Sequence, residues 1–155
     1  MVTLTHIISA SYIGARAAGV SPTETNYIIL TFLSAGILDI DHVYYLIKNR
    51  AFYKSKGYKG NLHNARSFLH ELPGFLVTGI IMLMISLFNY KLALLMGIPM
   101  MIHLAQDLLA GVSIPFSPVD KTQITLIPQK TSYRIALDVV FLVTFSILWI
   151  KFLYA

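Results

Sequence analysis

Histidine and carboxylate side chains recur inside or beside the apolar runs of this 155-residue sequence. An aspartate at the centre of a membrane helix costs roughly 2.5 to 3.5 kcal/mol on insertion scales, so a set of such residues requires compensation. Imidazole and carboxylate, without sulfur, form the ligand set of zinc, manganese and iron sites. The chain has no cysteine, so any metal must be held by nitrogen and oxygen ligands. The residues concerned are His6, Asp39, Asp41, His42, His63, His70, Glu71, His103 and Asp107.

The spacing of these residues places several of them in pairs on one side of a helix. Residues three, four or seven positions apart share a face, because a helix repeats about every 3.6 residues. Arg66 belongs to one such pair, and its guanidinium is a fork suited to phosphate or another anionic group. The pairs are Asp39 with His42, Arg66 with His70, His63 with His70, and His103 with Asp107.

The elements that must position these side chains are predicted to be membrane helices. The sequence is 56% hydrophobic and 12% charged, and this charged fraction is about half that of a soluble globular protein. We therefore expect an all-α fold, a polytopic membrane helix bundle that forms a single domain over residues 1–155 and has about five transmembrane helices. A kink is predicted at Pro73. The apolar runs lie at about 2–18, 27–47, 61–88, 92–112 and 135–153.

Consecutive helices run in opposite directions, which puts the polar positions on one side of the membrane. Asp39, His70 and His103 each lie nine residues from the same side of their runs, which is roughly 13 Å at the rise of a helix. Four polar faces from four helices therefore converge, and helix bundles commonly hold metal sites in their cores. The sequence predicts a metal centre below one membrane surface.

Positive residues predict the orientation of the chain. Of the twelve Lys and Arg residues, nine fall on the side that carries the loop between the second and third runs. We therefore expect the amino terminus and the metal site on the cytosolic side of the cell membrane, and the carboxyl terminus outside. These basic residues flank apolar runs, so they fit anionic lipid headgroups rather than nucleic acid. They are Lys48, Arg50, Lys54, Lys56, Lys59, Arg66, Lys121, Lys130 and Arg134.

Other roles remain open for several of the polar residues. A single histidine in a helix bundle is more often a hydrogen-bonded core residue than a ligand, and His6 and His63 lie nearest the surface. Asp41 lies off the face of the neighbouring ligand pair, so it is equally suited to cap a helix or to support a ligand. Glu71 directly follows His70 and points elsewhere.

The order of the motifs resembles that of a known family. Together, and over nearly the whole chain, they are similar to the membrane-bound metal-dependent hydrolases of the YdjM-like family. The motifs are Thr5-His6, Asp39-Ile40-Asp41-His42, Arg66-Ser67-Phe68-Leu69-His70, His103-Leu104-Ala105-Gln106-Asp107 and Pro115-Phe116-Ser117-Pro118.

This chain departs from the family pattern at two motifs. The family typically has Pro-Asp-x-Asp and His-Arg-Gly-x-Thr-His-Ser, whereas Leu38 replaces the proline and Ala65 occupies the position of the first histidine. Ser67, Leu69 and Glu71 replace the glycine, threonine and serine. The differences imply an altered substrate, a different ligand set or reduced activity. The spacing also resembles, more distantly, the all-helical zinc-dependent phospholipase C enzymes.

The leading hypothesis is a cytosol-facing, membrane-embedded metal-dependent hydrolase with two or three divalent ions. Zinc is the expected metal, with manganese and iron as alternatives. Asp39, Asp107 and Arg66 are the expected catalytic residues, and a phosphoester of a lipid or another amphiphile is the expected substrate. The expected metal ligands are His6, Asp39, Asp41, His42, His63, His70, His103 and Asp107.

Two hypotheses of other classes use the same residues. In a metal-ion or proton transport element they would form a relay, but all of them lie on one side of the membrane. In a non-catalytic membrane adaptor the metal would only hold the helices of the bundle together, and the basic loop 48–59 would bind anionic lipid or a partner. Membrane lipid is the expected partner, nucleic acid is not, and the sequence gives no oligomeric state.

Overall fold

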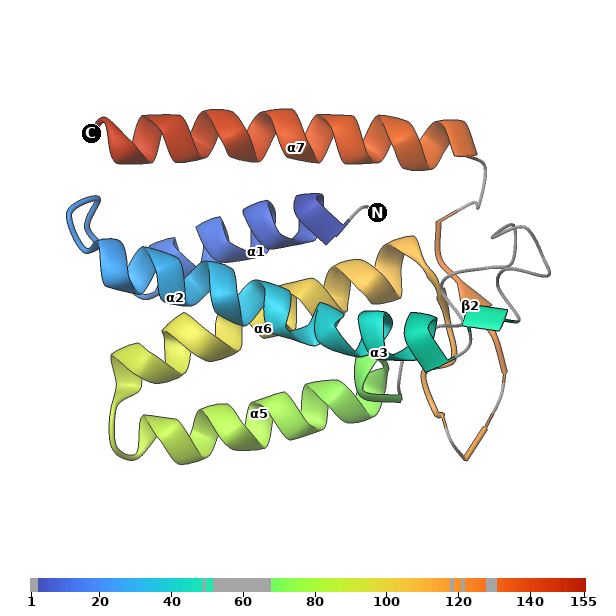
Figure 1. Ribbon diagram of the computed structural model, residues 1–155. Coiled ribbons are helices and arrows are strands. Elements are labelled where there is room, and N and C mark those ends of the chain that lie inside the picture. Colours follow the sequence, from blue (N-terminus) through green and yellow to red (C-terminus); the bar gives the residue numbers. More distant parts are fainter. Residues whose placement is uncertain (1–2, 49, 52–67, 118, 121, 128–130) are drawn as a thin grey trace.

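A computed structural model describes residues 3–48, 50–51, 68–117, 119–120, 122–127 and 131–155. The described residues are mostly helical, which confirms the predicted all-α class (Figure 1). Two short strands, β1 and β2, pair antiparallel, with Val112 opposite Thr125. The elements in order are α1 (Thr3–Ala17), α2 (Thr25–Gly36), the 3₁₀ turn η1 (Ile37–Asp39), α3 (Ile40–Lys48), the 3₁₀ turn η3 (Phe68–His70), α5 (Leu72–Ser86), α6 (Tyr90–Ala110), β1 (Val112–Ser113), β2 (Ile124–Thr125) and α7 (Thr131–Leu153).

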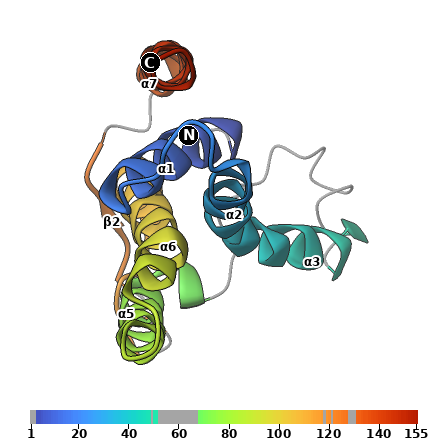
Figure 2. The ribbon, with the colours of Figure 1, turned by 90° about the vertical axis from the view of Figure 1, so that its left-hand side faces the viewer.

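Helix α6 is the centre of the bundle. It packs against α1, α2 and α5, whereas α7 packs against α1 (Figure 2). Gly14 of α1 faces Pro99 of α6, and a Cβ atom at this glycine would overlap the proline ring. The close approach of α1 and α6 therefore depends on the missing side chain, and it brings their polar residues together.

Local sequence features set the helix ends. Asn89 caps α6, because its Oδ1 accepts a hydrogen bond of 2.9 Å from the Leu92 amide. Helix α1 ends at Ala17 and is followed by Gly19, which has a φ of 62°, and the Val20 amide donates to the Ala15 carbonyl at 2.9 Å. This left-handed ending is the Schellman motif, in which glycine carries no Cβ penalty. It turns the chain from α1 into α2.

The predicted kink at Pro73 is wrong, because α5 begins at Leu72 and Pro73 lies in its first turn. Proline suits this position, since the first amides of a helix have no partner within the helix. His70 therefore lies in a separate turn, η3, before α5. The helix predicted over 27–47 also divides, at η1, and Asp39 lies at this division.

The prediction of five transmembrane helices is not supported. Among the described residues, two helical segments are long and apolar enough to cross a membrane, Tyr90–Ala110 and Ser132–Leu153. Helices α1 and α5 have 15 residues each and α2 has 12. At a rise of about 1.5 Å per residue they are shorter than a hydrocarbon core of about 30 Å. The apolar runs continue beyond these helices, so run length overestimated helix length.

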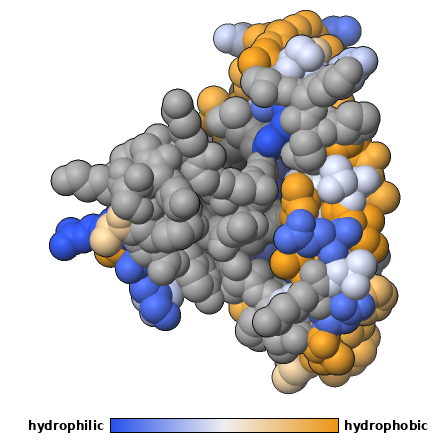
Figure 3. Space-filling view, turned by 90° about the vertical axis from the view of Figure 1, so that its right-hand side faces the viewer, coloured by the Kyte–Doolittle hydropathy of each residue, from blue (hydrophilic) through white to orange (hydrophobic). Residues whose placement is uncertain are grey.

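Large apolar side chains remain exposed on the outer helices. On α5 they include Leu76, Ile80 and Leu83, and on α7 they include Val143 and Ile147. Figure 3 views the end of the molecule at which α7 begins, and hydrophobic residues cover much of the flank on the right of that view. Apolar exposure on this scale is unusual for a soluble monomer and suits a lipid environment.

Candidate metal centre

Five of the predicted ligands come together where α1, η1, η3 and α6 meet. Figures 1 and 2 show these elements converging beside the central helix. All three histidines are buried, and His103 is fully inaccessible. We refer to the group as the His/Asp cluster, which consists of His6, Asp39, His70, His103 and Asp107.

The distances within the cluster match those between ligands that share a metal ion. His103 Nε2 lies 3.5 Å from Asp39 Oδ1 and 3.7 Å from Asp107 Oδ2. His70 Nε2 lies 3.8 Å from Asp107 Oδ2, and His6 Nδ1 lies 3.5 Å from Asp107 Oδ1. A direct hydrogen bond would be about 2.7 to 3.2 Å long. Two ligands of a tetrahedral zinc, each about 2.1 Å from the ion, lie about 3.4 Å apart.

The position of the hydrogen on the His103 ring leaves its other nitrogen able to bind a cation. Its Nδ1 lies 2.7 Å from the Ala35 carbonyl oxygen, which can only accept, so Nδ1 carries the hydrogen. In the neutral imidazole Nε2 then has a lone pair, and two carboxylates face it. These groups repel one another unless a proton or a metal ion lies between them. Fixing one ring nitrogen by a carbonyl is the usual way to orient a metal-binding histidine.

Asp107 faces different histidines with its two oxygens. Oδ1 is near His6, and Oδ2 is near both His70 and His103. Two overlapping groups of three residues have all their ligand atoms within 4.8 Å, and His103 belongs to both. Asp107 therefore lies near all three histidines of the cluster.

A buried hydrogen-bond network, which the sequence analysis missed, supports the cluster from α1. Ser9 donates to the Thr5 carbonyl at 2.7 Å and accepts from Gln106 Nε2 at 2.7 Å. Gln106 lies three residues after His103, on the same face of α6. Its position was a signal available in the sequence, but its partner on α1 was not.

Glu71 lies outside the cluster but beside it in the chain. It is buried, and its carboxylate accepts a hydrogen bond from the Ser113 hydroxyl. This contact joins the start of α5 to β1, the strand that follows α6. It therefore helps to hold His70 of η3 near the end of α6.

Four of the predicted site residues have no described side chain. His63 and Arg66 lie outside the described residues, and their predicted roles stay predictions. The backbone of Asp41 and His42 belongs to α3, directly after Asp39, but nothing is described of their side chains.

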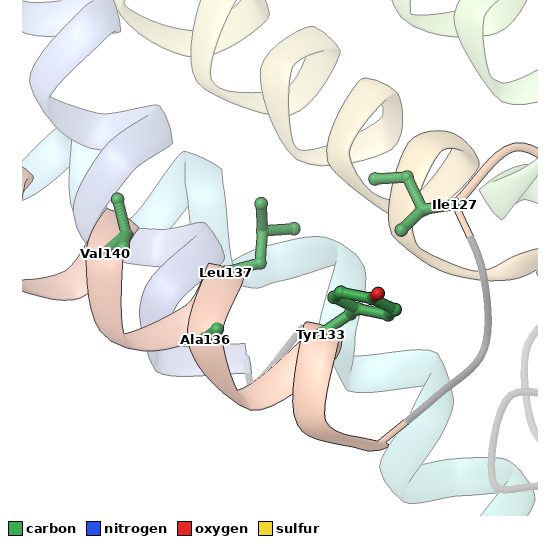
Figure 4. Close-up of a pocket in the computed structure, with 5 residues that line it drawn as sticks. All are labelled: Ile127, Tyr133, Ala136, Leu137 and Val140. Carbon is green, nitrogen blue, oxygen red and sulfur yellow. The ribbon is translucent and has the colours of Figure 1, made fainter.

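An apolar cavity of about 450 Å³ lies beside the first half of α7, apart from the cluster. Figure 4 shows Leu137 and Val140 pointing into the space between α7 and the bundle, with Tyr133 and Ile127 at one end. None of the residues that line it belongs to the cluster.

A comparison with known families shows to which family the chain belongs. A family model described as YdjM inner membrane protein matches residues 1–155. No curated protein and no solved structure matches, so the likeness to phospholipase C remains a prediction. The family and the two apolar helices point to a membrane protein. The chain therefore belongs to the YdjM inner membrane protein family.

Proposed function

We propose that this protein is a membrane-embedded, metal-dependent hydrolase whose His/Asp cluster binds two divalent ions. The proposal rests mainly on one observation, the buried Nε2 of His103 facing the carboxylates of Asp39 and Asp107 at 3.5 and 3.7 Å. Burial of such a group is costly unless a cation compensates it. Nitrogen-rich ligation of this kind favours zinc over magnesium or calcium, with manganese and iron as alternatives.

The cluster offers room for two ions. Two overlapping groups of possible ligands are His6 with His103 and Asp107, and Asp39 with His70 and His103; one ion would take each group, but the groups share His103. A single imidazole nitrogen binds one ion, so His103 completes one site. Asp107, whose two oxygens face different histidines, would be a ligand in this centre.

Divalent ions there would supply a Lewis acid and a nucleophile that is active at neutral pH. The protein orients the ligands through the Ala35 carbonyl and through the Ser9–Gln106 pair. Asp39 is the proton acceptor in this proposal, because 15% of its side chain is accessible whereas His103 is closed to solvent. Arg66 would bind the anionic group of the substrate, as its position before His70 predicts.

A phosphoester of a lipid or another amphiphile is the proposed substrate. The chain belongs to a membrane protein family and exposes large apolar side chains on α5 and α7. We place the cluster and the amino terminus on the cytosolic side, since nine of the twelve basic residues lie in two stretches of the sequence, 48–66 before η3 and 121–134 around the start of α7. Reporter domains inserted at Lys56 and fused after Ala155 would test this orientation, and an external Lys56 would contradict it.

A relay across the membrane is less well supported. The hydrophobic core lies toward the other end of the bundle and includes Ala15, Leu95 and Trp149. A proton or metal path needs polar groups along its whole length. Within the part of the chain that the structure describes, the metal-binding groups found lie in this one cluster.

Hydrolysis is tested with detergent-purified protein, a chromogenic phosphodiester and a fluorescent phospholipid. We expect hydrolysis that stops on chelation and returns with zinc. Asp107→Asn should lower kcat/KM more than about 100-fold, because residues that merely support metal ligands already cost about 10- to 100-fold. Asp138→Asn on α7 is the matched control and should retain activity. If metal-loaded wild type cleaves neither ester, or Asp107→Asn keeps the wild-type rate, the proposal is wrong.

A further inference from the structure

A second concave site lies at the opposite end of the bundle from the His/Asp cluster. It is a cavity of about 340 Å³ between the end of α1 and the end of α7. Arg16 lies in the last turn of α1, and Lys151 lies in the last turn of α7. Figure 1 shows these helix ends together, on the side where the chain ends and away from the amino terminus. The walls also include Tyr12, Val20, Pro22, Leu148, Phe152 and Ala155.

The two cations of this cavity have no acidic partner among the residues that the structure describes. Neither Arg16 nor Lys151 forms an ion pair with any acid that the structure describes. The Arg16 guanidinium lies 5.9 Å from the centroid of the Phe152 ring, which is a cation–π contact and not an ion pair. By contrast, Lys91 is paired with Glu24 at 2.8 Å. The cavity therefore has two positive groups above apolar walls.

The position of the cavity indicates what compensates this charge. Ser132–Leu153 is a candidate membrane span, so Lys151 falls where the span reaches the headgroup region. Tyr12 and Trp149, which pack edge to face at 5.5 Å, are of the aromatic types that favour this region. Outside the cavity, Ile147 and Ile150 of α7 are exposed and offer an apolar surface for hydrocarbon chains. A free phosphate ion would use the cations but leave the apolar walls uncovered.

We propose that this cavity binds one anionic phospholipid, whose phosphate lies between Arg16 and Lys151 and whose chains run along α7. The bound lipid bridges α1 and α7, which also meet through the aromatic group of Tyr12, Trp149 and Phe152 and through a hydrogen bond of 3.0 Å from Trp149 Nε1 to the Ile8 carbonyl. The site is separate from the His/Asp cluster, so it does not depend on hydrolytic activity. It is a binding site for a structural lipid and not the substrate site.

Lipid binding is measured in detergent by native mass spectrometry, with phosphatidylglycerol and phosphatidylcholine as competing ligands. We expect wild type to prefer phosphatidylglycerol by about 30-fold, which corresponds to about 1 kcal/mol for each of the two cations. Arg16→Gln with Lys151→Gln should remove the preference, and each single change should lower it about 5-fold. Arg16→Lys with Lys151→Arg keeps both charges and should retain it. Lys91→Gln, which removes a paired cation at the same end, is the matched control and should also retain it.

Three results would overturn the proposal. They are equal binding of the two lipids by wild type, an unchanged preference in the Gln double variant, and binding of glycerol phosphate as tight as that of phosphatidylglycerol. Both cations are exposed, so their removal leaves the core intact. Fluorescence of Trp149, the single tryptophan, checks this because its ring stacks on Phe32. If the double variant nevertheless unfolds, the single variants give the same test.

Discussion

At the scale of residues, the cluster depends on groups that are not themselves ligands. Ser9 and Ser11 are both fully buried in α1, but they have different partners. Ser9 accepts the amide hydrogen bond of Gln106, whereas Ser11 donates to the Ile8 carbonyl of its own helix. Variants at these two positions therefore distinguish a hydroxyl that supports the cluster from one that is only buried in its own helix.

Ser9→Ala should destabilise the protein by about 1 to 3 kcal/mol, because it leaves the buried Gln106 amide without an acceptor. It should also weaken metal binding by about 10- to 100-fold, as loss of a supporting partner does. Thermal unfolding and a zinc titration measure the two effects. Ser11→Ala is the control and should cause a smaller loss of stability and a smaller loss of zinc affinity. Equal losses in the two variants would show that the Ser9–Gln106 bond has no special role.

Residue types and spacing predicted much of the cluster but not its supporting bonds. His103 and Asp107 were identifiable because they are four residues apart within an apolar run. The Ala35 carbonyl that fixes the His103 tautomer belongs to the backbone of another helix, so no residue type marks it. Which hydroxyl faces Gln106 depends on the rotation of α1 against α6, which hydropathy does not specify.

At the scale of elements, the contact between α1 and α6 brings His6 to the other ligands. Gly14→Ala should force these helices apart, because the new methyl group would overlap the ring of Pro99. We expect a loss of about 1 to 3 kcal/mol in stability, typical of overpacking, together with a lower metal affinity. Gly79→Ala on α5 is the matched control, since its methyl would meet only the flexible end of Met101, at 3.4 Å. A normal zinc titration for Gly14→Ala would contradict this account of the helix contact.

The other ends of α2 and α6 are joined by an ion pair whose strength depends on pH. Lys91 Nζ donates to Glu24 Oε1 at 2.8 Å, and this hydrogen bond lowers the pKa of Glu24 below 4.5. A carboxyl with a lowered pKa in the folded state stabilises the fold above its unfolded pKa, and this contribution is lost as pH falls through the folded pKa. Glu24→Gln should therefore lower the Tm slightly at neutral pH, and the difference from wild type should vanish in acid. A difference that grows as the pH falls below 4.5 would contradict the assignment.

At the scale of the whole molecule, composition predicted the all-α class, but hydropathy overestimated the number of spans. An apolar run marks residues that avoid water, and it does not show where a helix begins. The run over 61–88 includes η3 before α5 starts at Leu72, and the run over 27–47 is divided by η1. Both divisions lie beside cluster residues, His70 and Asp39. Two of the cluster's residues therefore lie in 3₁₀ turns beside helix ends and not within α-helices.

Metal binding should stabilise the whole bundle, because the cluster joins α1, η1, η3 and α6. An ion present at about 100 times its dissociation constant adds about 2.7 kcal/mol to the free energy of unfolding. For a protein of this size that is a rise in Tm of about 5 to 10 °C. Differential scanning fluorimetry with zinc and with a chelator measures the shift. A Tm that does not respond to either would indicate that metal plays no part in holding these elements together.

The most direct test of the account is the metal content of the purified protein. Wild type is compared by elemental analysis with the Asp39→Ala, His103→Ala double variant and with Asp138→Ala, which removes a carboxyl group outside the cluster. We predict about two ions per chain in wild type and in Asp138→Ala, and loss of both ions from the double variant, as expected for a two-metal site. If wild type holds no metal above background, the cluster is not a resident metal centre and the proposed function is wrong.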